Sequence, residues 1–77
     1  MRQSDLLLVT RTRADLKSGA ARTLRVACGL TQTEIAAQIG VSSVAVSRWE
    51  SGDRTPRGDA ALRYARLLAA LRKAAAA

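Results

Sequence analysis

The segment between Val41 and Trp49 sets short polar side chains and one arginine, Arg48, among apolar residues. If Val41, Val46 and Trp49 hold this segment as a helix against a neighbouring element, the residues between them point outward. Hydroxyl and guanidinium groups presented in this way can hydrogen-bond to base edges in the major groove of DNA, which is wide enough to admit an α-helix. The segment therefore predicts a helix that reads duplex DNA.

The sequence offers little for catalysis or for metal binding. Histidine is absent and Cys28 is the only cysteine, which excludes the usual zinc ligand sets and an intramolecular disulfide. The carboxylates do not cluster, and there is no glycine-rich phosphate loop. Cys28 falls on an apolar helical face, so we interpret it as a structural thiol and not as a nucleophile. We expect no enzymatic activity, no cofactor and no bound metal.

A preceding helix must hold the polar segment in place. Thr31 is a typical helix N-cap, and Glu34, three residues later, completes a capping box. This pattern predicts a helix over residues 32–39. Ala36 is small where two helices must cross closely. Gly40 ends the helix at a position that needs a positive φ.

A second helix follows directly after Gly40. Ser42 or Ser43 caps it, and it extends to about Ser51, where Gly52 ends it. Two short helices on either side of a single glycine have the spacing of a helix-turn-helix. This motif would present the face of the second helix to a ligand.

The other periodic segments predict three more helices. They are expected over residues 5–17, capped by Ser4 or Asp5; over residues 20–28; and over residues 59–74, capped by Asp59. The apolar run Leu6–Val9 taken alone would also fit a strand. The fold class is therefore all-α, a compact orthogonal bundle of about five helices that contains the helix-turn-helix.

The charge of the chain points to a polyanionic partner. Its 77 residues include 13 basic and six acidic ones, a net charge of +7 at pH 7. Residues 31–50 carry a net −1, whereas the segments before and after them carry +4 each. This division is expected if the flanks bind phosphates and the centre reads bases. A solvated basic surface without a partner is the alternative.

A family resemblance rests on a set of residues in register along the chain. They are Leu24–Arg25, Gly29–Gln32, Ile35–Ala36, Ile39–Ser42, Val46, Trp49–Glu50, Gly52 and Pro56. Residues 20–71 thereby resemble the lambda repressor-like Cro/CI (XRE-type) helix-turn-helix domain. We expect a single DNA-binding domain over residues 1–77, in which 31–51 form the helix-turn-helix and 1–17 an additional N-terminal helix.

The resemblance implies roles for the residues on the outward face of the second helix. These DNA-binding candidates are Ser42, Ser43, Val44, Ser47 and Arg48. Arg48 can donate two hydrogen bonds to guanine, or else contact a phosphate or only solvent. Val44 is interpreted as a contact to a thymine methyl group, with packing at the edge of the core as the alternative. The serine hydroxyls fit several bases or a phosphate.

The resemblance also implies phosphate contacts and a structural ion pair. Gln32 corresponds to a glutamine that meets a phosphate at a helix N-terminus, where an anion is favoured in any case; a plain helix-forming role is the alternative. Arg54 and Arg57 are assigned to phosphates, and Arg22 is a further candidate. Arg25 and Glu50 fall at positions that pair within the fold.

These observations predict a sequence-specific transcriptional regulator that binds double-stranded DNA. We expect a repressor that binds an inverted repeat as a homodimer, through an interface at Leu6–Val9 or at Leu67 and Leu71. One alternative is an antitoxin-type module that binds a protein partner, a toxin or polymerase, and regulates its own gene; another is a DNA-bending excision factor. No long apolar segment or signal peptide is recognised. A cytoplasmic, nucleoid-associated protein of bacterial or phage origin is therefore expected.

Overall fold

A computed structural model describes all residues, 1–77, and contains five helices and no strand. The helices are α1 (Gln3–Ser18), α2 (Ala20–Ala27), α3 (Gln32–Ile39), α4 (Ser43–Ser51) and α5 (Gly58–Ala76). The predicted all-α class is confirmed. None of the helices is both long enough and apolar enough to cross a membrane.

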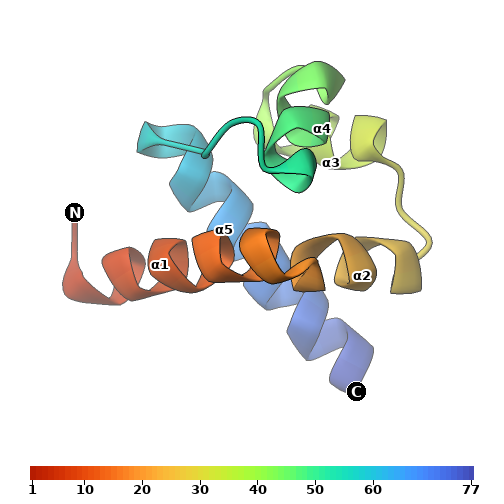
Figure 1. Cartoon of the computed structure of the whole chain (residues 1–77). Coiled ribbons are helices and arrows are strands. Elements are labelled where there is room, and N and C mark those ends of the chain that lie inside the picture. Colours follow the sequence, from red (N-terminus) through yellow and green to blue (C-terminus); the bar gives the residue numbers. More distant parts are fainter.

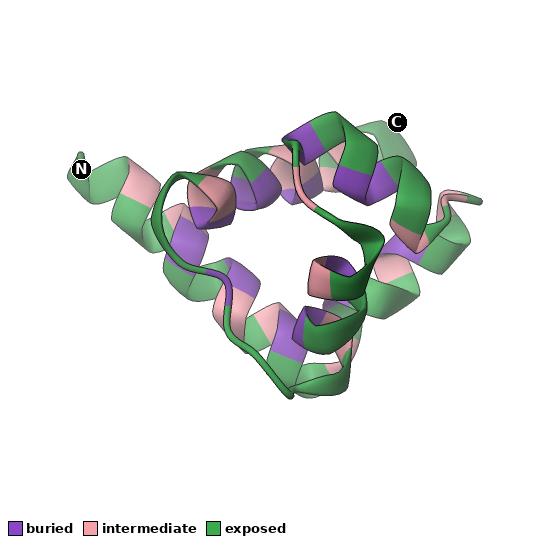
Figure 2. Cartoon of the chain, turned by 90° about the horizontal axis from the view of Figure 1, so that it is seen from above, coloured by how far each residue is buried: buried purple, intermediate pink, exposed green.

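The helices pack in two groups around one interior. Helices α1 and α2 follow each other almost in line, with α5 crossing behind them, and α3 and α4 lie together beside these three (Figure 1). Seen from above, the buried stretches of the ribbon turn toward the centre (Figure 2). This arrangement presents α4 at the surface while its inner side contacts the rest of the bundle.

The interior is almost entirely aliphatic, with one aromatic pair. A cluster of nine buried residues joins all five helices: Leu16, Ala21, Ile35, Ala36, Ile39, Val46, Trp49, Tyr64 and Leu68. A smaller cluster of Val9, Ala61 and Ala65 fixes α1 on α5. The rings of Trp49 and Tyr64 lie 5.3 Å apart with a 32° tilt, within the range of favourable aromatic contacts.

Two predicted helix caps are wrong, although the helices themselves form. Helix α1 begins at Gln3 with Arg2 as its N-cap, and neither Ser4 nor Asp5 caps it. Helix α5 begins at Gly58, so Asp59 lies in its first turn and makes no cap. The carboxylate of Asp5, inside the first turn of α1, instead pairs with Arg66 on α5 at 3.3 Å.

The helix-turn-helix prediction is confirmed with its local signals. Thr31 and Glu34 form the capping box, with both hydrogen bonds at 3.0 Å. Gly40 has a φ of 74°, in the left-handed region. It ends α3, and its N–H donates a hydrogen bond to the carbonyl of Ala36. Open space surrounds the position that a Cβ at Gly40 would occupy, so the requirement for glycine is conformational and not steric.

Candidate nucleic-acid interface

Helix α4 is held by two buried residues and exposes the side that faces away from them. Val46 is fully buried, and Trp49 retains only 7% of its exposure against the ring of Tyr64. The Oγ of Ser42 accepts the backbone N–H of Ala45 at 3.1 Å and so caps the helix, as predicted. The candidates on the outward face are all exposed: Ser42, Ser43, Val44, Ser47 and Arg48.

The exposed face of α4 offers hydrogen-bonding groups without internal partners. The side chains of Ser43, Ser47 and Arg48 make no hydrogen bond within the protein. Val44 is apolar and 55% exposed, so its methyl groups are accessible to a partner. Hydroxyl and guanidinium groups beside one methyl-bearing side chain suit the mixed polar and apolar edges of bases in the major groove.

A buried ion pair joins α2 to the end of α4. Arg25 donates from Nε to Glu50 Oε2 at 2.6 Å and from Nη2 to Oε1 at 2.8 Å. Its remaining nitrogen, Nη1, donates to the carbonyl of Leu30 at 2.8 Å. The two side chains are only 10% and 3% exposed. This two-pronged geometry fixes the orientation of α4 relative to α2 more rigidly than a single bond would.

The pairing also sets the protonation of both groups. Burial acts to raise the pKa of Glu50, but hydrogen bonds from Arg25 and Gln32 outweigh it and hold the pKa below its usual value. The hydrogen bond to Glu50 raises the pKa of Arg25 above its usual value. Arg22 contributes a further favourable charge near Glu50. The pair therefore stays ionised throughout the neutral range.

Gln32 belongs to the same network. It is the first residue of α3, and its Nε2 donates to Glu50 Oε1 at 3.0 Å. The side chain is thus tied to α4 and half-buried, where the sequence suggested only a phosphate contact or a plain helix former. The Nε2 amide has a second N–H that this bond does not use, and it lies with the free backbone N–H groups at the start of α3, where an anion is favoured.

The loop between α4 and α5 holds Arg54 and Arg57 at the surface. The N–H groups of Asp53 and Arg54 both donate to the carbonyl of Arg48, at 2.9 and 3.2 Å, which folds the loop back on the helix end. Both arginines are exposed and neither forms an ion pair. They flank Pro56, which is buried.

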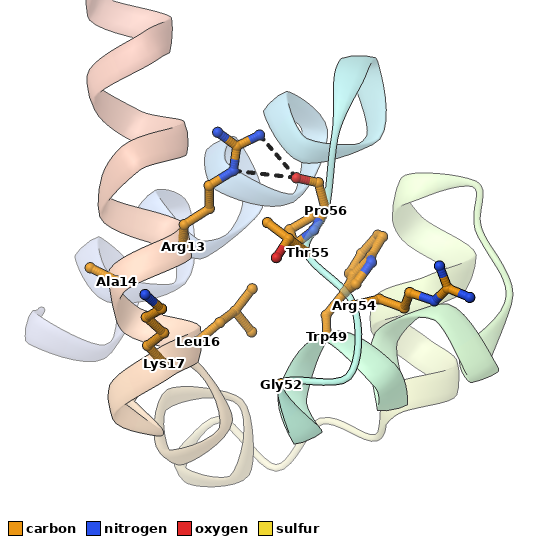
Figure 3. Close-up of a pocket in the computed structure, with 9 residues that line it drawn as sticks. All are labelled: Arg13, Ala14, Leu16, Lys17, Trp49, Gly52, Arg54, Thr55 and Pro56. Carbon is orange, nitrogen blue, oxygen red and sulfur yellow. Dashed lines mark hydrogen bonds between the residues drawn. The ribbon is translucent and has the colours of Figure 1, made fainter.

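Sequence reasoning missed one residue that braces this loop. Arg13 on α1 donates to the carbonyl of Pro56 from Nη2 at 3.1 Å and, less closely, from Nε at 3.4 Å (Figure 3). The two residues are 43 positions apart in the chain. Nothing in the local pattern around Arg13 signals this contact, because it depends on how α1 packs in the finished fold.

The fold and the exposed face of α4 are those of a helix-turn-helix protein, and a comparison of the sequence with family models agrees. A family model described as helix-turn-helix matches residues 22–71, which is more than half of the chain. The chain therefore belongs to the XRE-type, lambda repressor-like helix-turn-helix family, and is a DNA-binding transcription regulator. Neither the curated proteins nor the solved structures contain a match to it. Helix α1 lies outside the matched residues.

Proposed function

We propose that this regulator is a repressor that recognises a specific duplex sequence, an inverted repeat, as a homodimer. The observation that supports it is the exposure of Ser42, Ser43, Val44, Ser47 and Arg48 on a helix whose other side is fixed by Val46 and Trp49. A rigid helix with an exposed polar face fits the major groove without rearrangement. A repressor bound there would occlude the polymerase.

Specificity is assigned to the face of α4. Arg48 donates to O6 and N7 of a guanine, a pairing worth about 1–3 kcal/mol of discrimination between bases. Val44 covers a thymine methyl group, which accounts for an apolar side chain left exposed. The hydroxyls of Ser42, Ser43 and Ser47 complete the contacts, to bases or to the adjacent backbone. Ser42 does so while its oxygen also caps α4.

Affinity is assigned to groups on either side of α4. Arg54 and Arg57 contact phosphates from the loop, and Gln32 contacts a phosphate at the start of α3. These contacts position the protein but carry little sequence information. Binding should weaken as salt rises, by about 0.9 log unit per log unit of salt for each phosphate neutralised.

Selection of bound sequences from a random duplex pool tests the proposal. We expect an inverted repeat with half-sites spaced by about one helical turn, roughly 10 base pairs from centre to centre. Recovery of unrelated sequences would contradict specific recognition. Recovery of a single unrepeated half-site would contradict the dimer, which sedimentation of the complex with the duplex would check independently.

Replacement of Arg48 then tests the assignment of α4. Arg48→Ala should lose about 1–3 kcal/mol of binding free energy for the selected duplex. At one position of the site, the variant should also bind duplexes with other base pairs equally well. Arg66→Ala is the matched control, because this exposed arginine lies on α5 and pairs with Asp5. Equal losses in the two variants would remove Arg48 from the readout.

One observation favours a second candidate, an antitoxin-type module that covers a protein partner. Leu6 and Leu7 are 53% and 62% exposed on α1, so this helix presents adjacent leucines to solvent. Leu7→Asp changes only this surface and should release a co-purifying partner while DNA binding persists. A dimer would also lose its interface if it formed there, and sedimentation of the variant separates the two outcomes.

A further inference from the structure

The two acidic residues of α1 are neutralised by arginines from α5. Asp5 pairs with Arg66 at 3.3 Å, and Asp15 pairs with Arg72 at 3.0 Å. Asp15 also lies 3.8 Å from Arg11 on its own helix. The negative charge of α1 is therefore compensated on the side that packs on α5.

The basic residues Arg13 and Lys17 lie on another side of α1, one helical turn apart. Both line a groove of about 390 Å³ between α1 and the loop that follows α4 (Figure 3). Arg54 and Thr55 line the same groove from the loop. Arg13 uses two of its nitrogens on the carbonyl of Pro56, whereas Lys17 makes no hydrogen bond or ion pair with the protein.

Three basic residues thus line one groove without an ion-pair partner, although the Arg54 guanidinium extends away from Arg13 and Lys17 (Figure 3). Arg13, Lys17 and Arg54 have no ion-pair partner, and Lys17 and Arg54 are exposed. Like charges gathered in this way raise the local positive potential and favour an extended polyanion. The groove adjoins the end of α4, since Trp49 and Gly52 form part of its lining.

We propose that α1, which lies outside the family match, is part of the DNA interface, with Lys17 contacting a backbone phosphate beside those held by Arg54 and Arg57. Arg13 is a positioning residue, because its bonds to Pro56 fix the loop against α1. The inference rests on the proposed binding of duplex DNA. It extends the row of phosphate contacts from the loop onto an element that the family core lacks.

The salt dependence of binding measures this contact. Each phosphate neutralised by a cation adds about 0.9 to the slope of log affinity against log salt. Between 50 and 200 mM salt, Lys17→Gln should therefore lose affinity by a factor about 3.5 smaller than the wild-type protein does. The preference for the selected duplex over a scrambled one should stay unchanged, because a phosphate contact carries no base information.

Lys73→Gln is the matched control, since it removes the same charge from an exposed site in the last turn of α5. A reduced slope in Lys17→Gln, with the wild-type slope in Lys73→Gln, supports the inference. Equal slopes in the two variants overturn it while leaving the proposed function intact. If the wild-type protein shows no preference among duplexes, the proposed function itself fails. Thermal melting of both variants checks that each is folded.

Discussion

Replacement of Glu50 by glutamine tests the network that holds α4. Glu50 accepts three hydrogen bonds, two from Arg25 and one from the amide of Gln32. Glutamine is nearly isosteric but offers one carbonyl oxygen, and its amide would turn a donor toward a guanidinium. Arg25 would then be a buried cation without a counter-charge, because its other partner is the neutral carbonyl of Leu30.

The expected loss is a large share of the total stability. Removal of one partner from a buried ion pair typically costs about 3–5 kcal/mol. A domain of this size has a free energy of unfolding of about 4–12 kcal/mol at 0.05–0.15 kcal/mol per residue. Glu50→Gln should therefore lower the melting temperature by at least about 12 °C. The sign does not depend on whether the intact pair itself is net stabilising.

Urea unfolding followed by tryptophan fluorescence measures this loss. Trp49 is the only tryptophan and is buried against Tyr64, so its emission reports loss of the core that contains α4. Asp53→Asn is the control, since Asp53 is exposed and has no ion-pair partner, and it should change stability by less than about 0.5 kcal/mol. An unchanged midpoint in Glu50→Gln would refute the reasoning.

The pH dependence gives an independent reading of the same group. The pKa of Glu50 is lowered in the folded protein. The stability that its ionised carboxylate gives the fold is therefore fully present above the usual pKa of 4.5, and it is lost as the pH falls below that value. Acid should therefore destabilise the wild-type protein more steeply than Glu50→Gln. The double variant Arg25→Met with Glu50→Leu should be more stable than either single one, since neither charge is left unpaired.

Three smaller predictions concern residues that shape the core and the turns. Thr31→Ala should lower the free energy of unfolding by about 0.5–2 kcal/mol in urea melts, because it removes one bond of the capping box; Thr33→Ala, exposed on the same helix, should not. Gly40→Ala should cost about 1 kcal/mol or more in the same assay because of the φ of 74°; an unaffected midpoint would show that the turn adjusts. Burial raises the pKa of Tyr64 to about 12, because the folded protein favours the neutral phenol. The free energy of unfolding is therefore unaffected by this group below pH 10 and falls as the pH rises toward 12. Tyr64→Phe should be as stable as the wild type or more so at pH 7, because the hydroxyl has no partner, and should resist alkali better.

The parts of the fold that the sequence predicted are those fixed by short-range chemistry. The capping box at Thr31 and Glu34 and the turn at Gly40 involve residues a few positions apart, so their pattern is visible in the chain. The cap predicted at Asp5 failed because α1 already begins at Gln3, and the carboxylate of Asp5 instead contacts Arg66, 61 positions away. At the start of α5, Gly58 with a φ of 62° is already the first helical residue, which puts Asp59 inside the first turn.

The same distinction applies to the site. The outward face of α4 could be inferred because Val46 and Trp49 mark its inner side, and Arg25 with Glu50 followed from the resemblance. The bond from Gln32 to Glu50 and the brace from Arg13 to Pro56 could not be inferred, since they join residues 18 and 43 positions apart whose side chains meet only in the packed fold. The spacing of apolar residues along a helix shows which way a side chain points, but it does not identify the distant residue that the side chain contacts.

Internal neutralisation determines where the positive charge of the chain becomes available. The carboxylates of Asp5 and Asp15 face α5, and that of Glu50 is enclosed by Arg25 and Gln32. Their arginine partners on α2 and α5 are therefore compensated. The cations left without ion-pair partners include Arg48 on α4 and Arg54 and Arg57 in the following loop, and others lie on α1, α2 and α5. Arg48, Arg54 and Arg57 thus lie without counter-charges on and directly after the helix that exposes Ser43 and Ser47, and this arrangement favours a polyanion lying across α4.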